Sequence, residues 1–362
     1  MTILYNIPAT WNAGGMERVL AIKASWLAAH GHKVLIVTSD QRGLAPAFQM
    51  DPSIEFHDLG INYDENNGAS FFSKLLLYPF KQICHRHRLS SLLKRIRPDI
   101  TVCMFGNEAG FLHRIKDGSK KVLEIHFSRF KRLQYGRSGL WALADRWRSR
   151  HDLAIVRRYD RFVVLTEEDR GYWGSLDNIR VIPNPRTFTF EAPAPLDSGT
   201  VLAVGRYTHQ KGFDLLLKAW KSIDTNGWTL RIAGSGEPLG DIPSNVITGP
   251  SDNIREEYCN AAFLVMSSRY EGLPMVLLEA QAAGLPAVSF ACKCGPRDVI
   301  TDGEDGILVP EGDIEALATG MKRLMEDTGL RLRMGAAAYR HSDRYDQERI
   351  MSQWESLFKE LS

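Results

Sequence analysis

Two glutamates in the second half of the sequence have the type and spacing to bind a phosphorylated sugar. Glu271 and Glu279 lie on either side of Gly272-Leu273-Pro274, which opens the apolar run MVLLEAQAAG. Proline at its start and glycine at its end predict a helix over residues 275–284. A helix N-terminus binds phosphate, and a carboxylate accepts hydrogen bonds from hydroxyl groups. This stretch is therefore suited to a nucleotide-sugar, although a core helix with two exposed glutamates is the plain alternative.

Two basic residues and two glycines farther upstream fit the same ligand. Arg206 and Lys211 occupy the loop after a predicted strand, where two fixed cations suit a diphosphate. Gly234 and Gly236 follow the next predicted strand and would admit a base or phosphate close to the backbone. Breaking a sugar–phosphate bond leaves negative charge on the diphosphate, which cations and helix N–H groups stabilise. No Asp-x-Asp sequence occurs, so we predict a reaction that needs neither a metal ion nor another cofactor.

The first half of the chain supplies two more candidates. Residues 3–8 and 33–38 read as strands around a helix, a βαβ unit that implies a parallel sheet. Gly15 stands just before that helix, where a side chain would block an approaching ligand. His126 ends the predicted strand 121–127, and ligands of open α/β sheets bind at the carboxyl ends of strands. A structural role for this histidine is equally open.

The remaining elements divide the chain into two α/β halves. Apolar runs predict strands over residues 51–59, 99–105, 161–166, 179–182, 245–248, 263–266, 287–290 and 306–309. A proline-rich segment after residue 183 reads as a hinge, so we place one domain over 1–186 and the other over 187–346. The segment 347–362 reads as a helix with one apolar side that packs back on the first domain. The expected fold is two Rossmann-like domains with parallel sheets that face across a cleft.

Charge is distributed unevenly between the two halves. The 362 residues carry a net charge of +2, yet residues 1–186 hold 28 Lys+Arg against 18 Asp+Glu and the rest hold 17 against 25. Such asymmetry indicates an anionic partner of the first half. The basic segments 74–97 and 128–161 fit an anionic membrane surface or an acceptor. A surface helix packed on its own sheet also explains 74–97, and no RNA-binding signature accompanies the second segment.

Cysteine usage and hydropathy indicate where the protein works. The five cysteines are odd in number and show no CxxC spacing, which favours a reducing cytoplasm. The chain opens directly into a strand without the pattern of a signal peptide, and no apolar run is long enough to cross a bilayer. We therefore expect a cytoplasmic protein, soluble or peripheral on the inner face of the membrane.

Several motifs in combination point to one family. They are GGMER (14–18), VGRYTHQKG (204–212), AGSGE (233–237), EGLP…LLEAQAAGLP (271–286) and CGPRDVI (294–300). With them the chain resembles the GT4 glycosyltransferases of GT-B fold, a retaining group that includes capsule, O-antigen and glycan-assembly enzymes. The resemblance covers nearly the whole chain and is strongest over residues 200–310.

The resemblance implies roles for the phosphate-binding residues. Arg206 and Lys211 would bind the donor's diphosphate, helped by the helix that opens with Gly272, Leu273, Pro274 and Met275. Gly15 would lie near the same phosphates from the other domain.

It also implies roles for the residues around the sugars. Glu279 would hold the ribose hydroxyls, Glu271 the donor sugar, and His126 would lie beside the transferred sugar. Asp298 stands where many relatives have glutamate, so its sugar contact does not carry over from the family.

The combined hypothesis is a retaining glycosyltransferase. It would move a hexose or N-acetylhexosamine from a UDP-sugar donor to a hydroxyl of a lipid-linked or surface-polysaccharide glycan acceptor. A glycosidase pair made of Glu271 and Glu279 leaves Arg206 and Lys211 without a role. The alternatives are a nucleotide-sugar epimerase of similar two-domain build and a non-enzymatic nucleotide- or RNA-binding protein, although no nucleic-acid partner is expected.

Overall fold

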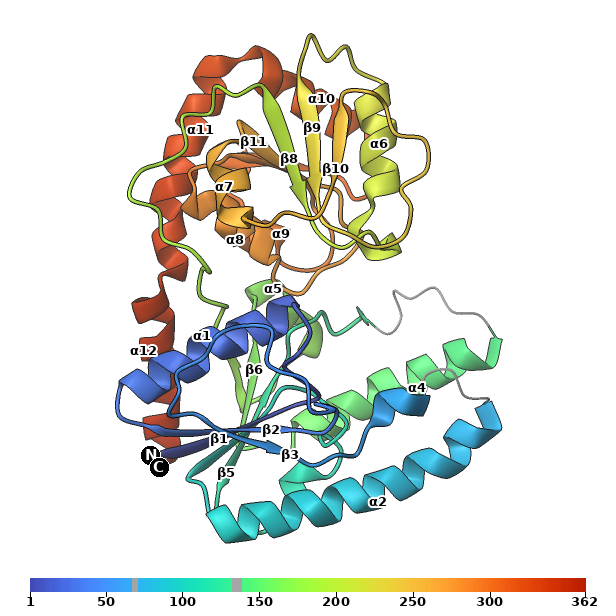
Figure 1. Cartoon of the computed structure of the whole chain (residues 1–362), viewed down its shortest axis with the longest axis vertical. Helices are drawn as coiled ribbons and strands as arrows, with labels where there is room; N and C mark the ends of the chain where they lie inside the picture. Colours follow the sequence, from blue (N-terminus) through green and yellow to red (C-terminus); the bar gives the residue numbers. More distant parts are fainter. Residues whose placement is uncertain (67–70, 132–138) are drawn as a thin grey trace.

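The chain folds around two parallel β sheets, one above the other in Figure 1. The computed structural model describes residues 1–66, 71–131 and 139–362. The first sheet has seven strands in the order β3-β2-β1-β4-β5-β6-β7, and the second has six in the order β10-β9-β8-β11-β12-β13. Every pairing between neighbouring strands is parallel. The expected pair of Rossmann-like domains is confirmed.

The strands are short, and most of them lie where the apolar runs predict. Those of the first sheet are β1 (Thr2–Ile7), β2 (Lys33–Thr38), β3 (Glu55–Asp58), β4 (Ile100–Cys103), β5 (Lys120–Glu124), β6 (Arg161–Val164) and β7 (Ile179–Val181). Those of the second are β8 (Thr200–Val204), β9 (Thr229–Ala233), β10 (Val246–Gly249), β11 (Phe263–Met266), β12 (Ala287–Phe290) and β13 (Gly306–Val309). Strands buried on both faces read as continuous apolar runs, which is why they were visible in the sequence.

Helices cover both faces of each sheet. Those between the strands of the first sheet are α1 (Gly15–Ala29), α2 (Phe71–Ile96), α4 (Gly139–Val156) and α5 (Glu167–Trp173). The second half carries α6 (Phe213–Lys221), α7 (Ile254–Cys259), α8 (Met275–Ala282), α9 (Pro296–Val299), α10 (Ile314–Glu326) and α11 (Thr328–His341), and the chain ends in α12 (Gln347–Leu361). Short 3₁₀ turns occur at Tyr63–Asn66, Leu112–Arg114, His209–Lys211 and Ser342–Tyr345.

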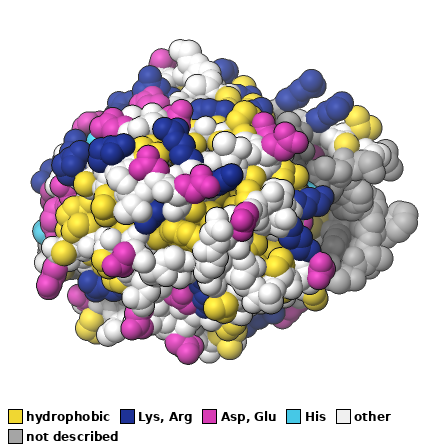
Figure 2. Space-filling view, turned by 90° about the horizontal axis from the view of Figure 1, so that it is seen from above, with side chains coloured by type: hydrophobic (Ala, Val, Ile, Leu, Met, Phe, Trp, Pro, Cys, Tyr) yellow, Lys and Arg dark blue, Asp and Glu magenta, His cyan; other side chains and the backbone are white. Residues whose placement is uncertain are grey.

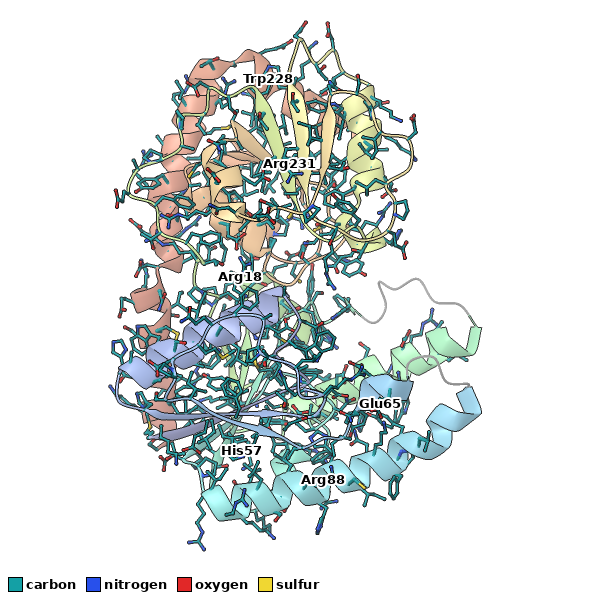
Figure 3. The ribbon with its side chains drawn as sticks, viewed as in Figure 1. Arg18, His57, Glu65, Arg88, Trp228 and Arg231 are labelled. Carbon is teal, nitrogen blue, oxygen red and sulfur yellow. The ribbon has the colours of Figure 1, made fainter. Side chains whose placement is uncertain are left out.

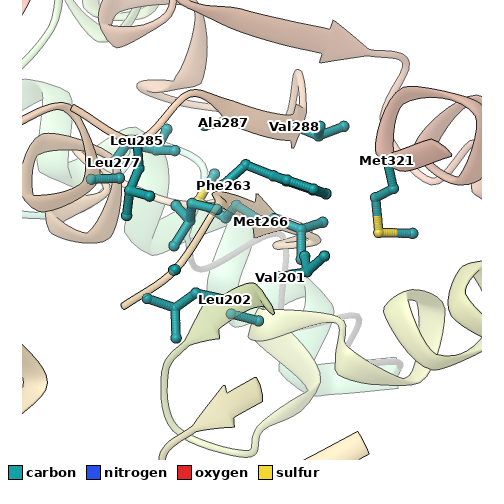
Figure 4. Packing of buried hydrophobic residues seen from close by; sticks show 14 of the residues in the cluster. Val201, Leu202, Phe263, Met266, Leu277, Leu285, Ala287, Val288 and Met321 are labelled. Carbon is teal, nitrogen blue, oxygen red and sulfur yellow. The ribbon is translucent and has the colours of Figure 1, made fainter. Parts of the chain in front are cut away.

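Each sheet has its own buried core. In the second half, Val201, Phe263 and Val288 of neighbouring strands share one cluster with Leu277 of α8 and Met321 of α10 (Figure 4). Burying side chains of this size contributes about 1.5–3 kcal/mol each. The first sheet is covered by a cluster on either face.

The last helix belongs to the core of the first sheet. Figure 1 shows α12 running down beside that sheet, so that the two chain ends lie close together. Its buried side chains include Ile350, Trp354 and Phe358, which pack with Tyr5 of β1 and Leu27 of α1. The chain therefore crosses from the second half back to the first before it ends.

Two long helices project from the first half. In Figure 1, α2 and α4 lie one above the other along the side of the first domain away from α12. Pro79 lies within α2. Among the described residues, no helix combines the length and apolar character that a bilayer crossing requires. Residues 132–138, part of the basic segment 128–161, lie outside the described residues.

Candidate active site

A cavity of about 340 Å³ lies between the two domains, at the carboxyl ends of their strands. Its lining comes from the loop after β1, the segment after β5, the loop after β8, and the loop from β11 into α8. The carboxyl ends of parallel strands meet at one edge of a sheet, where ligands of α/β proteins bind. Nine of the residues proposed from sequence line this cavity: Gly15, His126, Arg206, Lys211, Glu271, Gly272, Leu273, Met275 and Glu279.

Glu271 and Lys211 form an ion pair in the floor of the cavity. Lys211 Nζ lies 2.7 Å from Glu271 Oε1, with the two side chains 17% and 9% exposed. Gln210 donates to the backbone carbonyl of Tyr270 at 3.0 Å and so holds the same loop. The sequence predicted a carboxylate and a cation in this region, and the structure brings the two into direct contact.

Two glycines permit close packing in the loop that carries Lys211. A Cβ at Gly205 would lie 3.1 Å from Lys211 Cε, so a larger residue there would crowd the lysine. Gly212 has a left-handed backbone with φ +65°, and a Cβ there would lie 2.1 Å from the carbonyl oxygen of Ser267. The glycines of the VGRYTHQKG motif therefore shape the loop that presents the cations.

Glu279 lies on α8 and holds partners from both domains. Its Oε1 accepts from Arg18 Nη1 at 3.2 Å, and its Oε2 accepts from the Tyr258 hydroxyl at 2.7 Å. Arg18 comes from α1, on the side facing the second domain (Figure 3). Burial raises the pKa of the Glu279 carboxyl, and the bonds from Tyr258 and Arg18 act in the opposite direction. The carboxylate still has lone pairs for further donors, because two oxygens accept about four bonds.

The start of α8 differs slightly from expectation. Pro274 is the residue before the first helical residue, Met275, and not a residue inside the helix. The helix ends at Ala282, two residues before Gly284. The first N–H groups of a helix have no partner within it, so those of α8 are suited to a phosphate oxygen. Met275 and Leu273 line the cavity next to this end.

His126 approaches the second domain through its backbone. A Cβ at Gly272 would lie 2.5 Å from the His126 carbonyl oxygen and 2.9 Å from Phe127 Cα. Only glycine permits so close an approach between backbones of different domains. The side chain of His126 is 5% exposed and lines the cavity. The first and second domains thus touch directly beside Glu271.

Arg206 lines the cavity, whereas the two glycines after β9 do not. Arg206 is exposed at the cavity and forms no ion pair within the described ranges. Gly234 and Gly236 do not line the cavity, since they pack on the loop after β8. A Cβ on Gly234 would lie 1.9 Å from the carbonyl oxygen of Gly205. Their contact with a nucleotide remains a prediction.

The cavity also has charged or polar neighbours that were not among the predicted site residues. Arg18 and Gln210 line it, and Glu17 is buried beside it. Burial raises the pKa of Glu17, while the nearby His126 and Arg206 lower it. Arg18 and Glu17 belong to the GGMER motif, and Gln210 precedes Lys211. Their position beside predicted site residues is the feature of the sequence that could have identified them. Spacing alone does not reveal that Arg18 reaches Glu279 in the other domain.

Two family models match the chain over most of its length. The model described as Glycosyltransferase Family 4 matches residues 13–186, and the one described as Glycosyl transferases group 1 matches residues 198–327. Each range contains most of one sheet and its helices.

The chain is similar to curated bacterial glycosyltransferases. The chain is 35% identical to the amylovoran biosynthesis glycosyltransferase AmsD of Erwinia amylovora, over 55% of this chain and 62% of AmsD. That match spans less than two thirds of the relative. The present chain also matches an enzyme of Campylobacter jejuni, at 26% identity over 98% of both chains. That enzyme is named GalNAc-alpha-(1->4)-GalNAc-alpha-(1->3)-diNAcBac-PP-undecaprenol alpha-1,4-N-acetyl-D-galactosaminyltransferase.

Solved structures share the fold. Sucrose-phosphate synthase from Thermosynechococcus elongatus superposes with a TM-score of 0.82 at 19% identity, over 99% of this chain and 98% of that one. Anabaena Alr3699/HepE, solved in complex with UDP and glucose, gives 0.73 at 14% identity over 99% and 100%. These likenesses confirm the expected GT-B arrangement of two parallel-sheet domains.

Proposed function

Because the chain belongs to glycosyltransferase family 4, we propose that it transfers a hexose or N-acetylhexosamine from a UDP-sugar to a hydroxyl of a glycan acceptor. The acceptor is a lipid-linked or surface-polysaccharide intermediate, and the configuration at the transferred carbon is retained. One observation carries the proposal: Lys211, Glu271, Arg206 and His126 line a single cavity between the domains. A glycosidase would leave the two cations, Arg206 and Lys211, without a role.

The cations and the start of α8 have a direct role in this reaction. As the bond from the sugar carbon to the diphosphate breaks, negative charge grows on the leaving group. Arg206 and Lys211 stabilise that charge, helped by the N–H groups at Met275 and after. This arrangement supplies the charge stabilisation that a metal ion gives in other transferases, so we propose that the reaction is metal-independent.

The new bond forms on the face from which the diphosphate leaves. The acceptor oxygen bonds to the sugar carbon, and its proton passes to a phosphate oxygen of the departing nucleotide. Glu271 accepts hydrogen bonds from donor-sugar hydroxyls, and His126 borders the sugar from the first domain. Glu279 accepts from the ribose hydroxyls, and Gly15 leaves room for the phosphates. In this scheme residues 1–186 bind the acceptor and residues 187–346 bind the donor.

An exposed apolar edge of the first domain fits an acceptor held at a membrane. Phe80 and Ile83 of α2 are 64% and 68% exposed, and Leu143 and Trp147 of α4 are 60% and 65% exposed. Phe80 and Ile83 are three residues apart and so lie on one side of the helix. Exposed apolar side chains of this size mark an interaction site when they gather on one face.

Basic residues accompany that edge. On α2 they include Arg86, Lys94 and Arg95, and on α4 they include Arg146 and Arg148, all of them exposed. In contrast, the face of the second domain seen from above in Figure 2 mixes Lys and Arg with Asp and Glu. We propose that α2 and α4 hold the protein against anionic lipid on the cytoplasmic face of the membrane. The PP-undecaprenol in the name of the Campylobacter relative supports a lipid-linked acceptor.

The test is nucleotide release from a panel of nucleotide-sugars, with EDTA present and with or without a lipid-linked glycan. We expect release of UDP from one donor, unaffected by EDTA and lost in Lys211→Ala. Isomerised sugar without release would favour an epimerase. RNA binding that falls steeply with salt, without turnover, would favour a nucleic-acid-binding protein. Sedimentation with phosphatidylglycerol vesicles, compared with phosphatidylcholine vesicles, tests the membrane surface separately.

A further inference from the structure

A buried pair of opposite charges lies behind His126 in the first domain. Lys23 Nζ of α1 is 2.6 Å from Glu124 Oε1 and 2.7 Å from Glu124 Oε2, at the end of β5. Each side chain is 1% exposed. Charged side chains are rarely this buried, because removing two ions from water costs several kcal/mol each.

The last helix of the chain covers this pair. The ring of Trp354, on α12, lies with its centroid 3.4 Å from Lys23 Nζ, and the ring of Tyr5 lies at 5.6 Å. An aromatic face attracts a cation, most strongly where water is excluded. The ammonium group of Lys23 is therefore held between Glu124 and Trp354.

The same carboxylate reaches the active-site histidine. His126 Nε2 lies 3.1 Å from Glu124 Oε1 as a charge contact that is not aligned as a hydrogen bond, and this buried nitrogen has no other polar partner among the described residues. The His126 backbone touches Gly272, and its side chain lines the cavity beside Glu271. Glu124 thus connects a buried lysine to a side chain of the candidate active site, and the catalytic scheme above does not use it.

Stability alone is a weak reason for such a pair. Replacing a buried ion pair by apolar residues of similar size is often neutral or stabilising. The strand β5 offers a comparison, since Lys121 near its other end pairs with Asp117 while 6% and 0% exposed. Among the described residues, that second pair forms no hydrogen bond or ion pair with the cavity lining. Of these two pairs, only Lys23–Glu124, at the carboxyl end of β5, contacts a residue that lines the cavity.

We propose that Glu124 and Lys23 are positioning residues for His126. Glu124 holds the imidazole with its proton on Nε2, so that Nδ1 accepts a hydrogen bond from a donor-sugar hydroxyl. Lys23 holds Glu124 in place and charged. A carboxylate beside one ring nitrogen fixes the tautomer of a histidine in this way. The catalytic part of the inference rests on the proposed transferase function.

The electrostatics of the pair agree with this geometry. Burial alone would raise the pKa of Glu124, but its neighbours, first among them the Lys23 ammonium, lower it to about 2. The carboxyl group therefore stays ionised beside the imidazole. The charged groups that face His126 or share the cavity with it, besides Glu124, are Glu17, Arg18, Lys131, Arg206, Lys211, Glu271 and Glu279.

The first experiment needs no substrate. In the full chain labelled with ¹⁵N-histidine, the His126 signal is assigned by its loss in His126→Gln. We expect the proton on Nε2, and a changed tautomer population in the double variant Lys23→Met/Glu124→Leu. Apolar replacement of both partners avoids a lone buried charge. The matched control, Lys121→Met/Asp117→Leu, should leave the signal unchanged. A proton on Nδ1 in the unmodified chain, or an unchanged tautomer in the first variant, overturns the proposal.

The second experiment measures catalysis. The Lys23→Met/Glu124→Leu variant should lower kcat about 10- to 100-fold, the usual cost of losing an orienting partner, with little change in KM. In a His126→Ala background the same changes should cost nothing further. If the two changes lower kcat equally in the unmodified chain and in the His126→Ala background, the pair has only a structural role. The same conclusion follows if the Lys121→Met/Asp117→Leu control lowers kcat to the same extent. If the unmodified chain shows no turnover, the transferase proposal fails, and the tautomer experiment alone decides the positioning role.

Discussion

Replacing Gly272 by alanine tests whether catalysis depends on the close contact between the two domains. The added Cβ would lie 2.5 Å from the His126 carbonyl oxygen, whereas ordinary contacts begin at 3.4 Å. The backbones must therefore separate by about 0.9 Å, the difference between these two values. The obstacle is backbone on both sides, so a side-chain rotation cannot relieve it.

This displacement falls within the candidate active site, because Gly272 adjoins Glu271 and contacts His126 of the first domain. A misplacement of about 1 Å can cost around 100-fold in rate, which corresponds to about 2.7 kcal/mol. We expect Gly272→Ala to lower kcat by that order, while the Tm changes little because each domain keeps its own core. Gly171 serves as control, since a Cβ there meets no atom within 4 Å.

The assay is the initial rate of nucleotide release from the donor identified in the panel, across donor concentrations. Gly171→Ala should match the unmodified chain. If Gly272→Ala retained more than about a third of the unmodified kcat, the contact with His126 would not be needed for the reaction. A large fall in Tm in Gly272→Ala would show that the substitution damages folding and not only the approach of the domains.

Two further predictions concern the charges of the site. Lys211→Met should lower kcat about 100- to 1000-fold, which is the cost of losing one donor to the transition state. Glu271→Ala should lose most of the transfer activity. A normal initial rate in either variant, with the fold intact, would refute the assignment of the site. The pKa of Glu124, about 2 in the folded chain against an ordinary 4.5, means that its stabilising effect is present above pH 4.5 and lost as the pH falls. In urea titrations between about pH 5 and pH 3, the Lys23→Met/Glu124→Leu variant should therefore lose less unfolding free energy than the unmodified chain, and equal losses would contradict this.

The sequence predicted the sheets better than the contacts between them. Apolar runs identified residues 33–38, 263–266, 287–290 and 306–309 as strands with the observed bounds. Strands of this kind are buried on both faces, so local composition reveals them. The mostly exposed strand β3 differs, since it spans only Glu55–Asp58 within the predicted 51–59. Before it, Asp51 accepts from Ser53 in a local turn that a strand assignment overlooks.

Pairings between distant residues were beyond the reach of sequence spacing. The motif order located Lys211 and Glu271, but their ion pair depends on how the loops after β8 and β11 cross. Lys23 looked like an ordinary helix residue, because nothing local shows that α12 will cover it with Trp354. Residues joined only by tertiary packing are found when the sheets have been assembled, and not before.

Each glutamate of the motif has a cation partner, and the two partners differ in origin. Glu271 pairs with Lys211 of its own domain, whereas Glu279 pairs with Arg18 of the other. A carboxylate can accept from ribose hydroxyls while it keeps its present donors. A nucleotide bound at Glu279 would therefore contact an interdomain bond without having to break it. Gly272 and His126 form another contact between the domains, and both line the cavity. Donor binding and domain approach thus use the same few residues, which explains how a change in the distance between the domains would reach the reacting sugar.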